Sequence, residues 1–101
     1  MPAESDQRQP PTFSGQTMRK YAFIYFLGED IDTIRNSLGQ HVRYWKGLGL
    51  DYYVNGPFAD RSGGLIVFSS DSPEKAGKII AQDPLVKAGA VGQYWLKEWV
   101  A

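Results

Sequence analysis

The sequence contains no cysteine and only one histidine, His41. The absence of cysteine excludes disulfides, thiolate zinc sites, iron–sulfur clusters and cysteine nucleophiles. A single imidazole excludes the usual histidine-rich metal centres within one chain. The glycine-rich stretch 61–64 matches no phosphate-binding pattern. We therefore expect no metal site and no cofactor.

The chain also lacks an excess of charge and a long apolar run. Its 11 basic and 11 acidic residues balance, which argues against nucleic acid as a partner because phosphate neutralisation needs a basic face. The longest strongly apolar run, residues 21–27, is far shorter than the roughly 20 residues that span a bilayer. No secretory signal pattern is present. We expect a cytoplasmic protein that binds neither nucleic acid nor membrane.

The first 17 residues differ in composition from the rest of the chain. Prolines, glutamines and scattered charges surround a lone Phe13. Such a segment buries too little apolar area to offset its ordering entropy, so we predict a flexible tail over residues 1–17. Residues 18–101 are then one domain, because the length leaves no room for two ordinary cores.

Apolar periodicity divides this domain into strands and helices. Strands are predicted over residues 20–27, 50–55, 65–69 and 93–100. One amphipathic helix follows Asp30 as N-cap, and a shorter one starts at Ser72-Pro73 and stops before Asp83-Pro84. The longer helix closes near residues 47–49, and its predicted core-facing stripe consists of Ile31, Ile34, Leu38, Val42, Trp45 and Leu48.

The order β-α-β-β-α-β is typical of a ferredoxin-like α+β fold, with a four-stranded antiparallel sheet and both helices on one face. The opposite face would carry alternate side chains of the first strand, either Tyr21, Phe23 and Tyr25 or their neighbours, and several from the last strand. So aromatic a face is hard to keep in water, and pairing with a second copy covers it. We therefore predict a homodimer with sheets packed face to face.

His41 is the first candidate for chemistry. It lies four residues before Trp45, so a helix places it on or beside the core-facing stripe. A structural histidine and a general acid/base both fit that position. An acid/base histidine needs a neighbour that orients its ring, and Asp83 is the best candidate because Pro84 pulls its backbone out of the helix. Asp-Pro is also a common stop signal, so spacing alone leaves the role of Asp83 open.

Two further glycine-containing segments are candidate parts of a site. Gly56-Pro57 either shapes the mouth of a pocket, where glycine allows close backbone approach, or simply ends a strand. The stretch Arg61 to Gly64 is interpreted as a hairpin turn. Serine hydrolysis has no support, because no nucleophile elbow surrounds any serine.

Taken together, several motifs resemble the YCII family (YciI-like proteins). The match covers about residues 19–100 in the expected order and is carried by His41-Val-Arg-Tyr44, Gly56-Pro57-Phe58, Gly63-Gly64, and Asp83-Pro84 with Gly89. The resemblance implies a dimeric α+β barrel of two ferredoxin-like protomers, in agreement with the topology above. One departure is Leu65, which stands where many members carry a polar residue.

The resemblance also implies a function and a site. The family's histidine–aspartate pair falls on His41 and Asp83, and Gly56, Pro57 and Phe58 become candidates for substrate binding. One activity recognised in the family is dehydrochlorination of a chlorinated hydroxyhydroquinone without a cofactor. Our leading hypothesis is therefore a cofactor-independent lyase or isomerase that uses a general acid/base pair on an aromatic or quinol-like metabolite.

Two alternatives share the same fold. One is a non-catalytic ligand-binding or structural homodimer in which His41 is a core residue. The other is a cofactor-free monooxygenase, which differs from the leading hypothesis in its need for dioxygen.

Overall fold

The computed structural model describes residues 18–100, so the predicted tail over residues 1–17 lies outside the described residues. The elements within the described part are β1 (Arg19–Leu27), α1 (Ile31–Gly47), β2 (Tyr53–Pro57), β3 (Gly63–Ser70), α2 (Pro73–Ala81), α3 (Pro84–Lys87) and β4 (Val91–Trp99). The strands form one sheet in the order β2-β3-β1-β4, and all neighbouring pairs are antiparallel.

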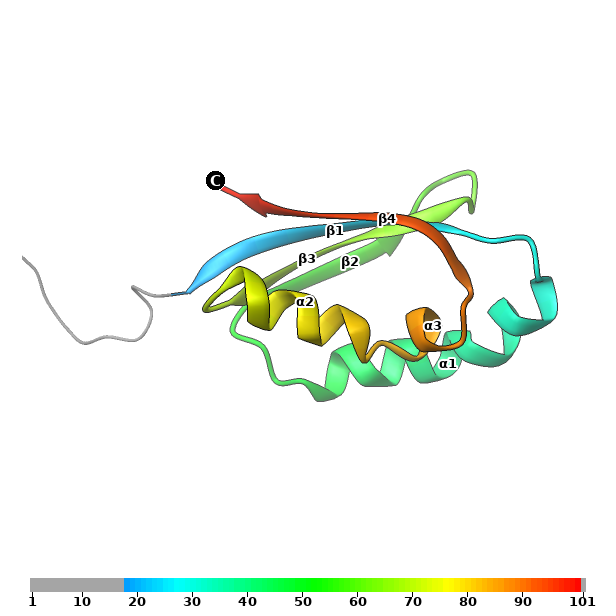
Figure 1. Cartoon of the computed structure of the whole chain (residues 1–101), viewed down its shortest axis with the longest axis horizontal. Coiled ribbons are helices and arrows are strands. Elements are labelled where there is room, and N and C mark those ends of the chain that lie inside the picture. The colour runs from blue at the N-terminus through cyan, green and yellow to red at the C-terminus, as the bar shows by residue number, and fades with distance from the viewer. Residues whose placement is uncertain (1–17, 101) are drawn as a thin grey trace, which may run out of the picture.

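Figure 1 shows α1, α2 and α3 on the same side of the sheet, while the other side carries no helix. This arrangement confirms the ferredoxin-like α+β fold. The predicted helix starts are also confirmed: Asp30 accepts the backbone N–H of Thr33 at 3.2 Å, and Ser72 accepts that of Lys75 at 3.1 Å. Within residues 18–100, no helix combines the length and the apolar character that crossing a membrane requires.

The prediction missed one helix and misplaced the starts of several strands. The short helix α3 was missed, although Asp83 as N-cap and Pro84 in the first turn are ordinary helix-start signals. Strand β2 starts later than predicted and runs through Gly56 to Pro57. Strand β3 begins at Gly63, because both glycines that were interpreted as a turn pair with β1.

The inner face of β1 is formed by Tyr21, Phe23 and Tyr25, which are buried beneath the helices. Their neighbours Ala22, Ile24 and Phe26 therefore face the open side. The sequence left these two possibilities open, and the structure selects the second. The inner residues join the core with Trp45, Ile66, Phe68, Ala76, Ile80, Leu85 and Ala90.

The buried stripe of α1 is rotated from the predicted one. Its buried residues are Ser37, His41 and Trp45, whereas Leu38 and Val42 are 45% and 41% exposed. His41 and Trp45 both contact the buried carboxylate of Asp83, and these contacts keep this face of α1 turned inward. Each residue that follows a buried one is thereby rotated about 100° towards solvent.

Candidate active site

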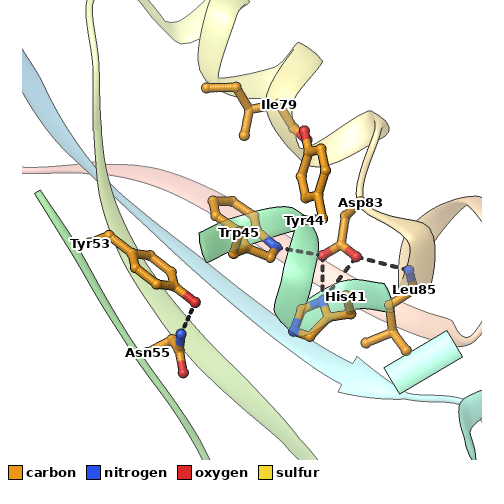
Figure 2. A network of polar contacts seen from close by, with 8 residues as sticks. All are labelled: His41, Tyr44, Trp45, Tyr53, Asn55, Ile79, Asp83 and Leu85. Carbon is orange, nitrogen blue, oxygen red and sulfur yellow. Dashed lines mark hydrogen bonds and ion pairs between the residues drawn. The ribbon is translucent and has the colours of Figure 1, made fainter. Parts of the chain in front are cut away.

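His41 and Asp83 meet in the interior between α1 and the junction of α2 with α3 (Figure 2). The Nδ1 atom of His41 lies 2.9 Å from Oδ1 and 2.8 Å from Oδ2 of Asp83. Asp83 is fully buried, and His41 is 7% exposed. The two side chains that the sequence suggested as a pair are therefore in direct contact.

Two further N–H groups hold the Asp83 carboxylate. The indole Nε1 of Trp45 donates to Oδ2 at 2.8 Å, and the backbone N–H of Leu85 donates to Oδ1 at 2.8 Å. Each carboxylate oxygen thus has one donor of its own. The imidazole Nδ1 is a third partner and lies close to both oxygens. Burying a charge is costly unless it is paired and hydrogen-bonded, and these donors supply that compensation.

The local sequence explains why Asp83 points inward. Its backbone N–H donates to the carbonyl of Ile80 at 3.0 Å and closes α2, while its own carbonyl accepts the N–H of Lys87 at 2.9 Å. Pro84 disfavours helical backbone at Asp83, which is extended with φ −60° and ψ 125°. Asp83 therefore ends one helix, starts the next, and directs its side chain towards α1.

The carboxylate fixes the protonation pattern of the imidazole. An ionised carboxylate only accepts hydrogen bonds, so the proton of neutral His41 resides on Nδ1. Nε2 then carries a lone pair, and Figure 2 shows this atom on the side of the ring away from Asp83. This arrangement gives a proton acceptor with a fixed tautomer, which general base catalysis requires.

Neutral tyrosines surround the buried carboxylate. The ring of Tyr25 stands edge-on to that of His41, with centroids 5.8 Å apart. Burial and, to a lesser degree, the charge of Asp83 raise the pKa of Tyr25 and of Tyr44. Burial also raises the pKa of Tyr53, against a smaller lowering by its hydrogen bond from Asn55. These raised pKa values keep the three phenols protonated near neutral pH.

Trp45 is the functional residue that the sequence analysis missed. Its indole ring stacks on Tyr53 at 6.0 Å with an interplanar angle of 5°, and it meets Phe68 edge-on at 5.0 Å. These contacts hold the indole N–H on Asp83. The available signal was its position four residues after His41, one helical turn away on the same face.

The predicted substrate-binding residues lie elsewhere. Gly56, Pro57 and Phe58 line a hollow of about 310 Å³ whose other walls include Val54 and Leu65, two residues on the open face of the sheet. His41 and Asp83 do not line it. The structure therefore brings His41 and Asp83 together but does not bring this segment into the same cavity.

A second hollow lies between α1 and α3, beside the backbone of the pair. It measures about 470 Å³ and its lining is polar, with Asn36, Ser37, Gln40, Gln82 and Lys87 among its residues. No group of three or more His, Asp or Glu side chains gathers as a metal-ligand set within residues 18–100.

Fold and site together define a small ferredoxin-like domain with a buried histidine–aspartate pair. The model of the YCII-related domain matches residues 18–100, and the chain belongs to this family. The uncharacterized protein YjpA of Bacillus subtilis (strain 168) is 46% identical over 44 residues, which are 44% of this chain and 51% of that protein. The match thus spans about half the length of that relative.

Solved structures of similar fold include the following two. The first is 5-chloro-2-hydroxyhydroquinone dehydrochlorinase (TftG) from Burkholderia phenoliruptrix AC1100 in complex with 2,5-dihydroxybenzoquinone, with a TM-score of 0.68, 16% identity, and coverage of 80% of this chain and 93% of that chain. The second is a dimeric ferredoxin-like protein of unknown function from Bacteroides fragilis NCTC 9343, with a TM-score of 0.57, 11% identity, and coverage of 85% and 98%. At these identities the likeness concerns the fold alone.

Proposed function

We propose that the protein is a cofactor-independent enzyme of lyase or isomerase type that acts on an aromatic or quinol-like metabolite. One observation carries the proposal: Nδ1 of His41 is bound by a fully buried carboxylate, so Nε2 is left as the proton acceptor. His41 is the proposed catalytic base, and Asp83 orients the imidazole and stabilises the imidazolium that forms.

For the specific reaction and substrate, we propose the elimination of chloride from a chlorinated hydroxyhydroquinone. Nε2 accepts a hydroxyl proton and returns it to the ring carbon that bears chlorine, which makes that carbon tetrahedral. Nε2, free again, accepts a second hydroxyl proton, so that this oxygen becomes a carbonyl while the electron pair moves through the ring and expels chloride. The substrate loses one proton and one chloride in total and becomes a hydroxyquinone, so no oxidant is needed. The fold neighbour that carries out such a dehydrochlorination supports this choice of substrate.

The test measures chloride release from 5-chloro-2-hydroxyhydroquinone under nitrogen. A positioned base contributes about 10²–10⁴-fold, so we expect His41→Asn to reduce the rate by at least about a hundredfold. Lys46→Ala, on the exposed side of the same helix, should retain the wild-type rate.

The alternatives predict different results. Equal rates for wild type and His41→Asn would exclude His41 as the base. Turnover that needs dioxygen would favour a monooxygenase. A quinol that raises the melting temperature of the wild type without being converted would favour a ligand-binding protein.

We also propose that the protein forms a homodimer through the open face of its sheet. This face carries Val54, Leu65, Trp95 and Trp99, which are 54%, 37%, 42% and 49% exposed. The dimeric fold neighbour supports the arrangement. A two-fold axis parallel to the strands would set β4 of each copy over β2 of the other, so the bulky tryptophans would face the partner's hollow beside Val54. A two-fold axis perpendicular to the strands would instead set β4 of one copy over β4 of the other, so that the tryptophans of the two copies would face each other.

Sedimentation equilibrium tests the dimer. We expect twice the chain mass for the wild type, and a large shift towards monomer for Trp95→Lys on the open face. Leu38→Lys is the matched comparison, because Leu38 is similarly exposed but lies on α1. Dissociation by Leu38→Lys and not by Trp95→Lys would assign the interface to the helices and refute the proposal.

A further inference from the structure

The hydroxyl of Tyr25 ends in a space that a glycine keeps open. Tyr25 on β1 pairs directly with Gly64 on β3. A Cβ atom on Gly64 would lie 2.5 Å from the Tyr25 hydroxyl oxygen and 2.8 Å from its Cζ atom. The same Cβ would lie 3.0 Å from the carbonyl oxygen of Gly56. The phenol therefore extends from the imidazole of His41 towards the edge strand β2.

The hydrogen bonding of Tyr25 differs from that of the other tyrosines near Asp83. The Tyr44 hydroxyl donates to the carbonyl of Ile79, and the Tyr53 hydroxyl accepts from Asn55. Within residues 18–100, no hydrogen bond engages the hydroxyl of Tyr25, although the residue is only 8% exposed. The Tyr21 hydroxyl is fully buried without a partner among these residues, but the Tyr25 hydroxyl oxygen is not, so it still reaches solvent and its donor is available to a bound molecule.

We propose that Tyr25 is a second polar contact of the ligand site, donating a hydrogen bond to the ligand oxygen that becomes negatively charged when His41 removes a proton. This inference rests on the proposed function and narrows its substrate class. The ligand is a planar ring with at least two oxygen substituents, one at Nε2 of His41 and another at the Tyr25 hydroxyl. A donor aimed at developing charge in a water-poor site is among the strongest catalytic interactions. Burial and the charge of Asp83 raise the pKa of Tyr25, which keeps this donor protonated.

The test is an equilibrium titration with 2,5-dihydroxybenzoquinone, an acidic planar ring with four oxygens, followed by its absorbance. Tyr25→Phe removes one hydrogen-bond donor to a charged acceptor, so we expect this variant to bind the probe at least about tenfold more weakly than the wild type. The matched control is Tyr44→Phe, which deletes a phenol hydroxyl near the same carboxylate but one committed to Ile79. It should bind the probe as the wild type does. With 5-chloro-2-hydroxyhydroquinone, Tyr25→Phe should lower kcat more than it raises KM, because the oxygen at Tyr25 gains charge on the way to the transition state.

Gly64→Ala provides a second variant in case Tyr25→Phe folds poorly. Its methyl group would displace the Tyr25 hydroxyl while keeping the phenol, and we expect the same loss of probe affinity. Unchanged probe binding in the folded variants would overturn the role of Tyr25. Chloride release that depends on His41 would leave the proposed function standing in that case. A wild type that fails to bind the probe at its solubility limit would overturn the ligand class itself.

Discussion

Replacing Asp83 with asparagine tests the pair at its centre, because the change keeps the shape of the side chain and removes its charge. The carboxylate accepts hydrogen bonds from His41, Trp45 and the backbone of Leu85. Asparagine offers one oxygen and one NH₂ group. At the Oδ1 position the NH₂ group would face the N–H of Leu85, and at the Oδ2 position it would face the N–H of Trp45. Either orientation sets donor against donor.

The cost follows from these contacts. A buried donor without an acceptor costs about 1–3 kcal/mol, and the remaining hydrogen bonds lose the strength that a charged acceptor gave them. Relief from burying a charge offsets part of this loss. We therefore expect Asp83→Asn to lower the free energy of unfolding by about 1–3 kcal/mol. For a domain of this size, each kcal/mol lowers the melting temperature by about 4–8 °C.

The variant should also change the tautomer of His41. The wild-type carboxylate requires a proton on Nδ1, whereas the asparagine NH₂ group can itself donate to Nδ1 and so allow the proton on Nε2. Long-range ¹⁵N–¹H correlation spectra over a pH series report the tautomer, and the single imidazole needs no assignment. We expect Nδ1–H alone in the wild type and a substantial Nε2–H population in Asp83→Asn.

Asp32→Asn is the matched control, because Asp32 is an exposed carboxylate on α1 that pairs with Arg35 at the surface, at 3.3 Å. It should leave the tautomer unchanged and lower the melting temperature by less than Asp83→Asn does, because Asp32 lies in the first turn of α1, where an exposed carboxylate contributes only about 0.3–1 kcal/mol. A wild-type imidazole protonated at Nε2, or an Asp83→Asn variant indistinguishable from Asp32→Asn, would refute the account of the pair.

Three other predictions concern two buried tyrosines, Tyr21 and Tyr25, and the half-buried Tyr44. The Tyr21 hydroxyl is buried without a hydrogen-bond partner among residues 18–100, so Tyr21→Phe should raise the free energy of unfolding by about 1–2 kcal/mol in urea titrations. The Tyr44 hydroxyl is bonded to a carbonyl, so Tyr44→Phe should lower the same quantity by about 0.5–1.5 kcal/mol. Because the pKa of Tyr25 in the folded state lies above its ordinary value of 10.0, the unfolded chain ionises first as pH rises, and stability falls above about pH 10. Tyr25→Phe should make that alkaline fall shallower, and an unchanged slope would contradict the raised pKa.

The order of the elements could be predicted because most of them carry a local signal. The caps Asp30 and Ser72 and the apolar periodicity of the helices are properties of a few adjacent residues. The same periodicity correctly predicted that His41 lies on an inward face. It could not give the rotation of α1, because that is determined by the contact of His41 and Trp45 with a carboxylate some forty residues further along the chain.

The orientation of β1 could not be predicted for a different reason. Residues 21–27 are apolar on both faces, so no polar alternation selects the inner one. The selection depends on the partner strand, where Gly63 and Gly64 face Phe26 and Tyr25. A Cβ on Gly64 would lie 2.5 Å from the phenol oxygen of Tyr25, so glycine at this position lets the phenol keep its place. Glycine opposite an aromatic residue is thus the signal that was interpreted as a turn.

The missed helix α3 and the candidate site depend on one another. A helix of four residues cannot be stable by itself, because nucleation costs more than one turn returns. In this protein it is held by burial of Leu85 and by the Asp83 cap on the Leu85 N–H. The oxygen that caps α3 also lies 2.9 Å from Nδ1 of His41, so the pair and the helix share one acceptor. Disorder in α3 would release a donor from Asp83, and loss of Asp83 would uncap α3. The Asp-Pro step is therefore a helix stop, a helix start and the anchor of the imidazole at once, and neither sequence interpretation of it was sufficient alone.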